Sequence, residues 1–173
     1  RPRARDLNIT PGLFPPGQHN AITDVPGVRV GQLTLIADDR IRLTAQAEVQ
    51  AGRDFRSRAG PTRPVWIAGS THEGEEEAVL AAQAIVRARH PSALLILVPR
   101  HPQRFDAVRS LLRKRGHAYA QRSSGELPVD AHEVFLVDTL GELQMFYAAA
   151  DVAFVGGSLV PIGGHNLLEP AAL

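Results

Sequence analysis

A run of six residues without a single polar side chain, 93–98 (ALLILV), constrains the fold of this chain more than any other feature. Such runs are typical of the central strands of parallel sheets, because both faces of those strands are covered by helices. Apolar or mixed segments of strand length recur on both sides of it, and helix-length segments separate them. The expected strands are 65–69, 93–98, 117–121, 134–137 and 152–155, and the expected helices are 45–59, 75–89, 103–115 and 140–150.

This alternation predicts an α/β fold, a Rossmann-like parallel sheet with helices on both faces. In the helix over 140–150, we expect Leu140, Leu143 and Tyr147 to face the sheet. Ligands of such sheets bind beyond the carboxyl ends of the strands. The residues that follow each expected strand are therefore the first candidates for a site.

Polar residues follow the first two strands. Ser70 and Glu73 have the spacing of a capping box, which would start the next helix, and a ligand role for Ser70, Thr71 or His72 is the alternative. Arg100 stands between two prolines at the end of the second strand, where it can meet a phosphate or form a surface salt bridge. His101 and His165 could be ligands for a metal, but neither has a partner at metal-site spacing, so we expect no metal.

The segment 154–170 reads as a strand, two glycine pairs and the first turn of a helix. Glycine lets the backbone approach a phosphate, and a helix start presents free N–H groups. Asn166 and Glu169 have the spacing of a capping box for that helix. The alternatives are a phosphate-binding turn and an ordinary tight turn.

Composition excludes several classes of function. The net charge of +1 gives no global attraction to nucleic acid or membranes, and the absence of cysteine excludes disulfides and thiolate chemistry. No apolar run is long enough to span a bilayer, and we expect a cytoplasmic location.

Residues 1–43 differ from the rest, because glycine, proline, asparagine and aspartate interrupt them throughout. Turns are expected at 15–17 and 24–27, with a short strand at 28–35. We therefore predict two parts: a strand–turn–strand segment over 1–43 and an incomplete Rossmann-like nucleotide-sugar-binding domain over 44–173.

The larger part resembles the C-terminal half of bacterial 3-deoxy-D-manno-octulosonic acid (Kdo) transferases. The matching motifs are WIAGSTHEGEE (66–76), LVPRHP (97–102), RSSGE (122–126), DTLGEL (138–143), AADVAFVGGS (149–158), and GGHN (163–166) followed by Glu169. The resemblance implies half of a glycosyltransferase of the two-Rossmann-domain type, GT-B, which binds the donor CMP-Kdo. The family transfers Kdo to a lipid A precursor in lipopolysaccharide synthesis at the cytoplasmic face of the inner membrane, without a metal or other cofactor.

The resemblance also implies the donor site. Arg100 would meet the phosphate, the turn at 140–142 would line the cytidine, the turn at 163–166 would offer backbone amides, and Glu169 would accept the ribose hydroxyls. The full expected donor set is Ser70, Thr71, Arg100, His101, Leu140, Gly141, Glu142, Gly163, Gly164, His165, Asn166 and Glu169. The family's catalytic carboxylate, acceptor surface and membrane anchor belong to a domain that we expect to be missing here, so we expect no catalytic residue.

Residues 1–43 resemble the N-terminus of self-cleaving P1-family (DmpA-like) aminopeptidases, through RARDL (3–7) and HNAITDVPGVRVG (19–31). The sequence is therefore interpreted as a truncated chimera. A peptidase fragment and an artificial folded domain without native function are the alternatives to donor binding. An open sheet edge after Val155 would favour a homo-oligomer.

Overall fold

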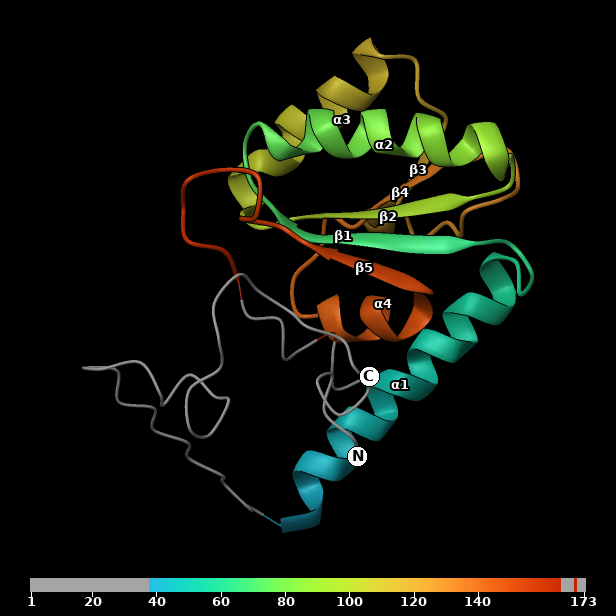
Figure 1. Cartoon of the computed structure of the whole chain (residues 1–173). Helices are drawn as coiled ribbons and strands as arrows, with labels where there is room; N and C mark the ends of the chain where they lie inside the picture. The colour runs from blue at the N-terminus through green and yellow to red at the C-terminus, as the bar shows by residue number, and fades with distance from the viewer. Residues whose placement is uncertain (1–37, 166–169, 171–173) are drawn as a thin grey trace, which may run out of the picture. The chain divides into compact units, whose positions relative to one another are not determined.

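The computed structural model describes residues 38–165 and residue 170, and they form a parallel α/β sheet with its helices (Figure 1). The strands are β1 (Val65–Thr71), β2 (Leu94–Pro99), β3 (Tyr119–Gln121), β4 (Val134–Leu136) and β5 (Val152–Val155). Their order is β3-β4-β2-β1-β5, and every neighbouring pair is parallel. The predicted Rossmann-like architecture is confirmed.

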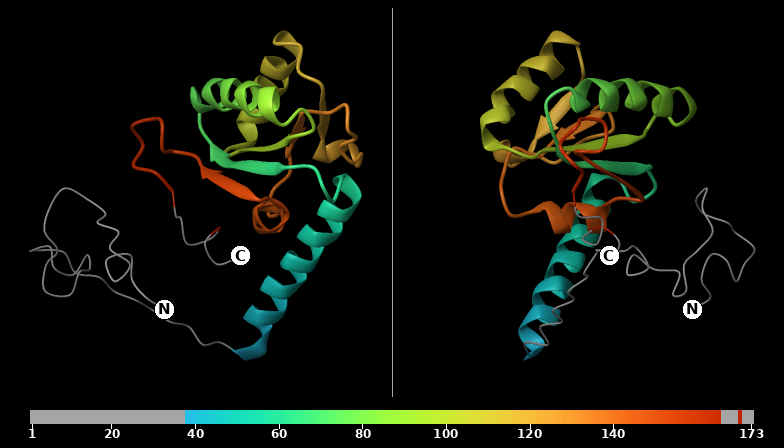
Figure 2. Two further views of the ribbon diagram at one scale, coloured as in Figure 1. Left: turned by 45° about the vertical axis from the view of Figure 1, so that its right-hand side comes forward. Right: turned by 60° about the vertical axis from the view of Figure 1, so that its left-hand side comes forward.

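Described helices cover both faces of the sheet, as both figures show. Helices α1 (Asp38–Ala59) and α4 (Leu143–Ala149) lie on one face, while α2 (Glu75–Arg89) and α3 (Phe105–Lys114) lie on the other (Figure 2). Strand β2 serves both layers with alternating side chains: Leu94 and Ile96 join the α1/α4 core, whereas Leu95 and Leu97 join the α2/α3 core. All four are fully buried, which is why the run 93–98 carries no polar residue.

The helices differ from prediction at their starts. Helix α1 begins at Asp38 instead of residue 45 and crosses position 43, and α3 is preceded by a 3₁₀ turn, Pro102–Arg104. The expectation that Leu140 faces the sheet is wrong, because Leu140 lies in the turn before α4 and its side chain is 69% exposed. The expected strand–turn–strand over 1–43 falls largely outside the described residues.

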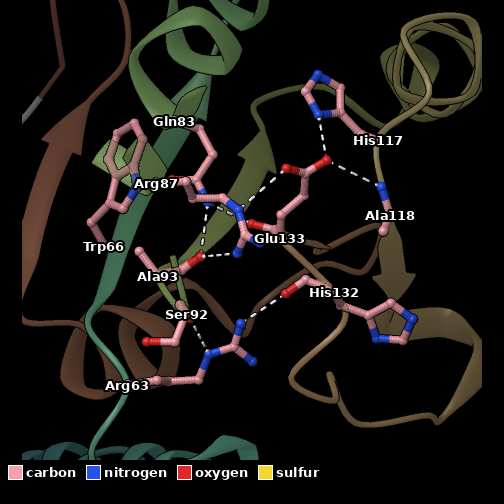
Figure 3. A network of polar contacts seen from close by, with 10 residues as sticks. All are labelled: Arg63, Trp66, Gln83, Arg87, Ser92, Ala93, His117, Ala118, His132 and Glu133. Atoms are coloured by element: carbon pink, nitrogen blue, oxygen red, sulfur yellow. Dashed lines mark hydrogen bonds and ion pairs between the residues drawn. The ribbon is translucent and has the colours of Figure 1, made fainter. Parts of the chain in front are cut away.

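A polar network lies at the amino ends of the strands (Figure 3). Gln83 of α2 accepts a hydrogen bond from Trp66 Nε1 at 2.7 Å and donates to the carbonyls of Ala93 and Glu133, at 3.1 and 2.7 Å. These carbonyls directly precede β2 and β4, so one buried side chain ties α2 to three strands. Because each buried polar group has a partner, the network holds this edge of the sheet.

Arg63 extends the same network at the entrance to β1. Its guanidinium is nearly fully buried and donates to the carbonyls of Ser92, Val129 and His132, at 2.8, 3.2 and 2.7 Å. Desolvation by burial is the main cause that lowers the pKa of Arg63, and the nearby Asp130 opposes it. The guanidinium therefore holds together loops whose carbonyls lie 29 to 69 residues from Arg63 in sequence.

Candidate functional site at the carboxyl ends of the strands

The carboxyl ends of β1, β2 and β5 meet at the edge opposite this network. The Arg100 N–H, just after β2, donates to the Thr71 carbonyl at 2.9 Å, and the Gly156 N–H, just after β5, donates to the Gly69 carbonyl at 2.8 Å. Ser70 adopts a left-handed conformation with φ of 56°, rare for a residue with a side chain. A Cβ at position 156 would overlap the Ser70 carbonyl, so glycine is required there.

Glu75, the first residue of α2, holds the glycine-containing loop that follows β5. Its buried carboxylate accepts hydrogen bonds from the N–H groups of Gly157, Ser158 and Leu159, at 2.8, 3.0 and 2.9 Å, and from the His72 N–H at 2.9 Å. Sequence reasoning missed this role. The only available signal was a glutamate three residues after His72, which fits a reaching-back contact at a helix start.

The predicted capping box of Ser70 and Glu73 is wrong. The N-cap residue of α2 is Gly74, which has no side chain to cap the helix, and the Glu73 side chain is 86% exposed and forms an ion pair with Arg104. Glu75 takes the place that was assigned to Glu73, because its carboxylate can bind both the helix start and the neighbouring loop.

Two opposing effects set the pKa of Glu75. Desolvation by burial works to raise it, and the backbone hydrogen bonds from Gly157, Leu159, His72 and Ser158 together outweigh that effect and lower it. Glu75 is therefore ionised at neutral pH. A negative charge of the protein itself thus lies at the start of α2, where helix dipoles stabilise anions.

Three histidines from different parts of the chain gather at this edge. His72 Nε2 and His165 Nε2 are 2.7 Å apart and hydrogen-bonded, and their rings stack with centroids 4.9 Å apart. His101 packs edge-on against His72, with centroids 5.4 Å apart. Sequence analysis named His101 and His165 singly, but their contact through His72 depends on the tertiary fold.

Arg100 lies beside this cluster with an exposed side chain. It acts electrostatically on His72, while among the described residues its guanidinium has no hydrogen bond or ion pair. Neighbouring Arg104, in contrast, is paired with Glu76 at 3.1 Å and Glu73 at 3.2 Å. Arg100 is therefore the cation at this edge that is available to an anionic ligand.

The remaining predicted donor residues divide into three groups. Gly164 lies close to Gly157, so the second glycine pair folds back onto the first, and Gly163 precedes it with φ of +91°. Leu140, Gly141 and Glu142 form a separate turn after β4, where Glu142 is hydrogen-bonded to Arg122 and Thr139. Asn166 and Glu169, together with the helix they were expected to start, lie outside the described residues.

Glu142 already has a partner in that turn. Arg122 donates to both of its carboxylate oxygens, with Nη2 2.6 Å from Oε1, and the Thr139 hydroxyl also donates to it. The Arg122 hydrogen bond is the largest cause that lowers the pKa of Glu142. The exposed Leu140 and Gly141, with φ of +82°, form the tip of this turn.

Asp138 organises the loop beneath it. Its carboxylate accepts from the Ser123 hydroxyl at 2.6 Å, the Ser123 N–H at 2.9 Å and Arg109 at 3.2 Å. Burial works to raise the pKa of Asp138, and these hydrogen bonds outweigh it, so the pKa is lowered. The motifs RSSGE and DTLGEL are thus joined by two buried or half-buried polar pairs.

The described residues hold no group of three or more histidines, cysteines and carboxylates arranged to hold a metal ion. Within residues 38–165, none of the helices combines the length and apolar content needed to cross a bilayer. The chemistry available at the edge is therefore cationic and hydrogen-bonding: one free guanidinium, three imidazoles and a loop rich in glycine.

A solved structure decides the family. The chain matches the C-terminal CMP-Kdo binding domain of WaaA from Acinetobacter baumannii with a TM-score of 0.69 and 36% identity, covering 73% of this chain and 67% of that one. The α/β unit belongs to the family of Kdo transferase C-terminal domains.

Curated Kdo transferases agree with this assignment over part of their length. The enzyme of Haemophilus influenzae is 52% identical over 110 residues, covering 64% of this chain and 26% of that protein. The enzyme of Bordetella pertussis is 47% identical over 132 residues, covering 73% and 30%. A probable mitochondrial Kdo transferase of Arabidopsis thaliana is 44% identical over 110 residues, covering 62% and 25%.

The chain therefore spans about a quarter to a third of the length of these curated relatives. No protein-family model matches it.

Proposed function

We propose that the α/β unit binds CMP-Kdo, the donor of Kdo transfer, at the carboxyl ends of β1, β2 and β5. The observation that carries the proposal is Arg100, an exposed guanidinium without a protein partner among the described residues, beside the three-histidine cluster. Its support is the likeness to the CMP-Kdo binding domain of WaaA from Acinetobacter baumannii.

In this proposal each part of the edge has a role. Arg100 pairs with the donor phosphate, and the exposed His101 lines its approach, whereas Ser70 and Thr71 are buried and support the backbone beneath it. The glycine turn of 163–166 offers N–H groups to the same phosphate, because glycine leaves the backbone accessible. The tip formed by Leu140 and Gly141 contacts the cytosine, and Glu142 holds that tip through its bond to Arg122.

The test is a calorimetric titration of the full chain with CMP. Removing one charge-assisted contact costs about 1.5 to 3 kcal/mol, so Arg100→Ala is expected to weaken CMP binding about ten- to a hundred-fold. Arg100→Lys keeps the charge and loses the planar fork, and we expect an intermediate affinity. Arg89→Ala is the matched control, because Arg89 is exposed in the last turn of α2.

Equal affinity of the wild type and Arg100→Ala, or no binding of CMP at millimolar concentration, would refute the assignment. AMP titrated in parallel separates recognition of cytidine from recognition of phosphate alone. Glu169→Ala tests the ribose contact that the family resemblance implies, and it is expected to weaken CMP and to leave inorganic phosphate unchanged.

Transfer of Kdo to a lipid A precursor, at the cytoplasmic face of a membrane, is our proposal for the whole protein to which such a domain belongs. For this chain by itself we expect donor binding without transfer, because no residue that we assign is a general base, which typically contributes 10²- to 10⁴-fold to a rate. The outer strand β5 has no second neighbour in the described sheet, and we propose it as the edge for self-association.

The peptidase-like interpretation of residues 1–43, and with it a chimeric origin, remains a prediction. Those residues fall mostly outside the described part, and an aminopeptidase assay with small aminoacyl amides tests them directly. We expect no hydrolysis.

A further inference from the structure

Two imidazoles whose Nε2 atoms are 2.7 Å apart must have one proton between them. If neither Nε2 carried a proton, two lone pairs would face each other, and if both did, two N–H groups would. One of His72 and His165 therefore donates and the other accepts.

The same geometry limits the charge of the pair. The neutral pair holds one N–H between the two Nε2 atoms. One additional proton can bind only at the free Nδ1 of the donating ring, because the accepting ring already carries its proton at Nδ1. It leaves the N–H···N bond intact and makes it charge-assisted. A second additional proton would break the bond. The pair can therefore be neutral or carry a single positive charge.

The surroundings favour the neutral pair in the absence of a ligand. Desolvation by burial is the first cause that lowers the pKa of His72, followed by His165, His101 and, more weakly, Arg100, while Glu75 acts in the opposite direction. His165 faces His72 from the loop after β5, Arg100 and His101 lie at the end of β2, and Glu75 lies at the start of α2. The ordinary histidine value is 6.5, so the lowered pKa of His72 leaves that ring neutral at pH 7.

Glu75 offsets these effects only in part, because the pKa of His72 is lowered on balance. The cluster is therefore surrounded mainly by positive or potentially positive neighbours. An oxyanion brought beside Arg100 would supply the missing negative charge and make an additional proton on the pair favourable.

We propose that the His72–His165 pair takes up one proton from solvent when the phosphate of a nucleotide binds at Arg100, so that binding strengthens as the pH falls toward 6. This inference rests on the proposed function. The reaction is a proton transfer from solvent or buffer to an imidazole, with no covalent bond made or broken in the ligand. By linkage, affinity would increase about three- to ten-fold per pH unit between pH 8 and pH 6, for an uptake of about half a proton to one proton.

The experiment is calorimetry of the full chain at pH 7 in two buffers of different ionisation enthalpy. The probe is the 5′-methyl phosphate ester of cytidine, a phosphodiester like that of a nucleotide-sugar. A phosphomonoester titrates near pH 6 and would add its own protons, whereas the diester does not. We expect an uptake of about 0.3 to 1 proton per ligand for the wild type.

His165→Gln keeps a hydrogen-bonding group and removes the titratable one, so we expect it to bind the probe with an uptake near zero. His90→Gln is the control, since His90 is exposed at the far end of α2 and is expected to behave as the wild type. Histidine ¹⁵N shifts of the wild type, recorded with and without the probe, provide a second measurement that needs no variant. We expect one ring of the pair to change from neutral to imidazolium.

The outcomes separate the two proposals. No binding of the probe or of CMP to the wild type would overturn the proposed function and the inference with it. Binding without proton uptake, and without a change of histidine shifts, would overturn the inference alone. Uptake that persists in His165→Gln would also overturn it, because the proton would then be taken up elsewhere.

Discussion

Replacing Glu75 by glutamine tests the central contact of the site. The change keeps the size of the side chain and removes its charge and one acceptor oxygen. In the wild type, Oε1 accepts from Ser158 and Leu159, and Oε2 accepts from His72 and Gly157. A glutamine can keep one of these two pairs with its oxygen, but its NH₂ group then faces the two N–H donors of the other pair.

The expected cost follows from these four bonds. A hydrogen bond to a charged group contributes about 1.5 to 3 kcal/mol, and two such bonds are lost in a buried place, so the gross loss is about 3 to 6 kcal/mol. Because the loop after β5 is at the surface and can move to let water in, we expect the free energy of unfolding to fall by about 3 kcal/mol.

Urea unfolding followed by fluorescence measures this change, because Trp66 is the only tryptophan and reports on β1 and α2 through Gln83. The matched control is Glu77→Gln, two residues along the same helix turn. Its side chain is 63% exposed and pairs with Arg115, so we expect a loss below about 0.5 kcal/mol. A Glu75→Gln variant within 1 kcal/mol of the wild type, on the same order as the control, would refute the role of Glu75 as the anchor of the loop.

The pH dependence has a definite sign. The pKa of Glu75 is lower in the folded chain than its ordinary value of 4.5, so its contribution is complete above pH 4.5 and is lost as the pH falls through the folded value. The stability difference between the wild type and Glu75→Gln should therefore be constant between about pH 6 and 8 and shrink below about pH 4.5. A difference that grows with acidification would contradict the reasoning.

Two further substitutions test the contacts that hold the two ends of the strands, at Arg63 before β1 and at Gly156 after β5. Arg63→Met removes a buried guanidinium and leaves the carbonyls of Ser92, Val129 and His132 without this donor. We expect the free energy of unfolding, measured in urea, to fall by about 3 to 5 kcal/mol. For the control Arg58→Met, at an exposed position, we expect a fall of less than about 0.5 kcal/mol. Gly156→Ala places a methyl group against the Ser70 carbonyl and should cost about 1 to 3 kcal/mol; a variant as stable as the wild type, with unchanged CMP affinity, would show that the ends of β1 and β5 can move apart freely.

The strands were predictable because their signal is local. The run 93–98 and the segments 65–69, 134–137 and 152–155 are recovered to within two residues. The run 93–98 is the clearest of these signals, since a central parallel strand must be apolar on both faces. The helix over 75–89 is found at the predicted residues, because Glu75 to Glu77 at one end and Arg87 and Arg89 at the other match the helix dipole.

The site was predictable only in part, because its decisive contacts are not local. Arg100 was named from its position after a strand, and its ligand role stays a prediction. The hydrogen bond of His72 to His165 joins residues 93 apart in sequence. Glu75 was overlooked for the opposite reason: Ser70 and Glu73 offered a familiar local pattern, and only the neighbouring loop after β5 shows which glutamate is used. The prediction that Leu140 faces the sheet was wrong for a similar reason, because an apolar residue next to a helix can belong to the turn that precedes the helix.

The carboxylate of Glu75 affects which groups can stabilise an anion at the carboxyl ends of the strands. Because it occupies the N-terminus of α2, that helix's dipole is already used by the protein, and an incoming phosphate depends for its counter-charge on side chains such as Arg100. A dipole belongs to the backbone and is the same whatever residues the helix carries, whereas a side chain is exchanged by one mutation. If the site binds a nucleotide as proposed, its residence time and salt sensitivity would therefore be adjustable by substituting a side chain such as Arg100, without disturbing the strands beneath.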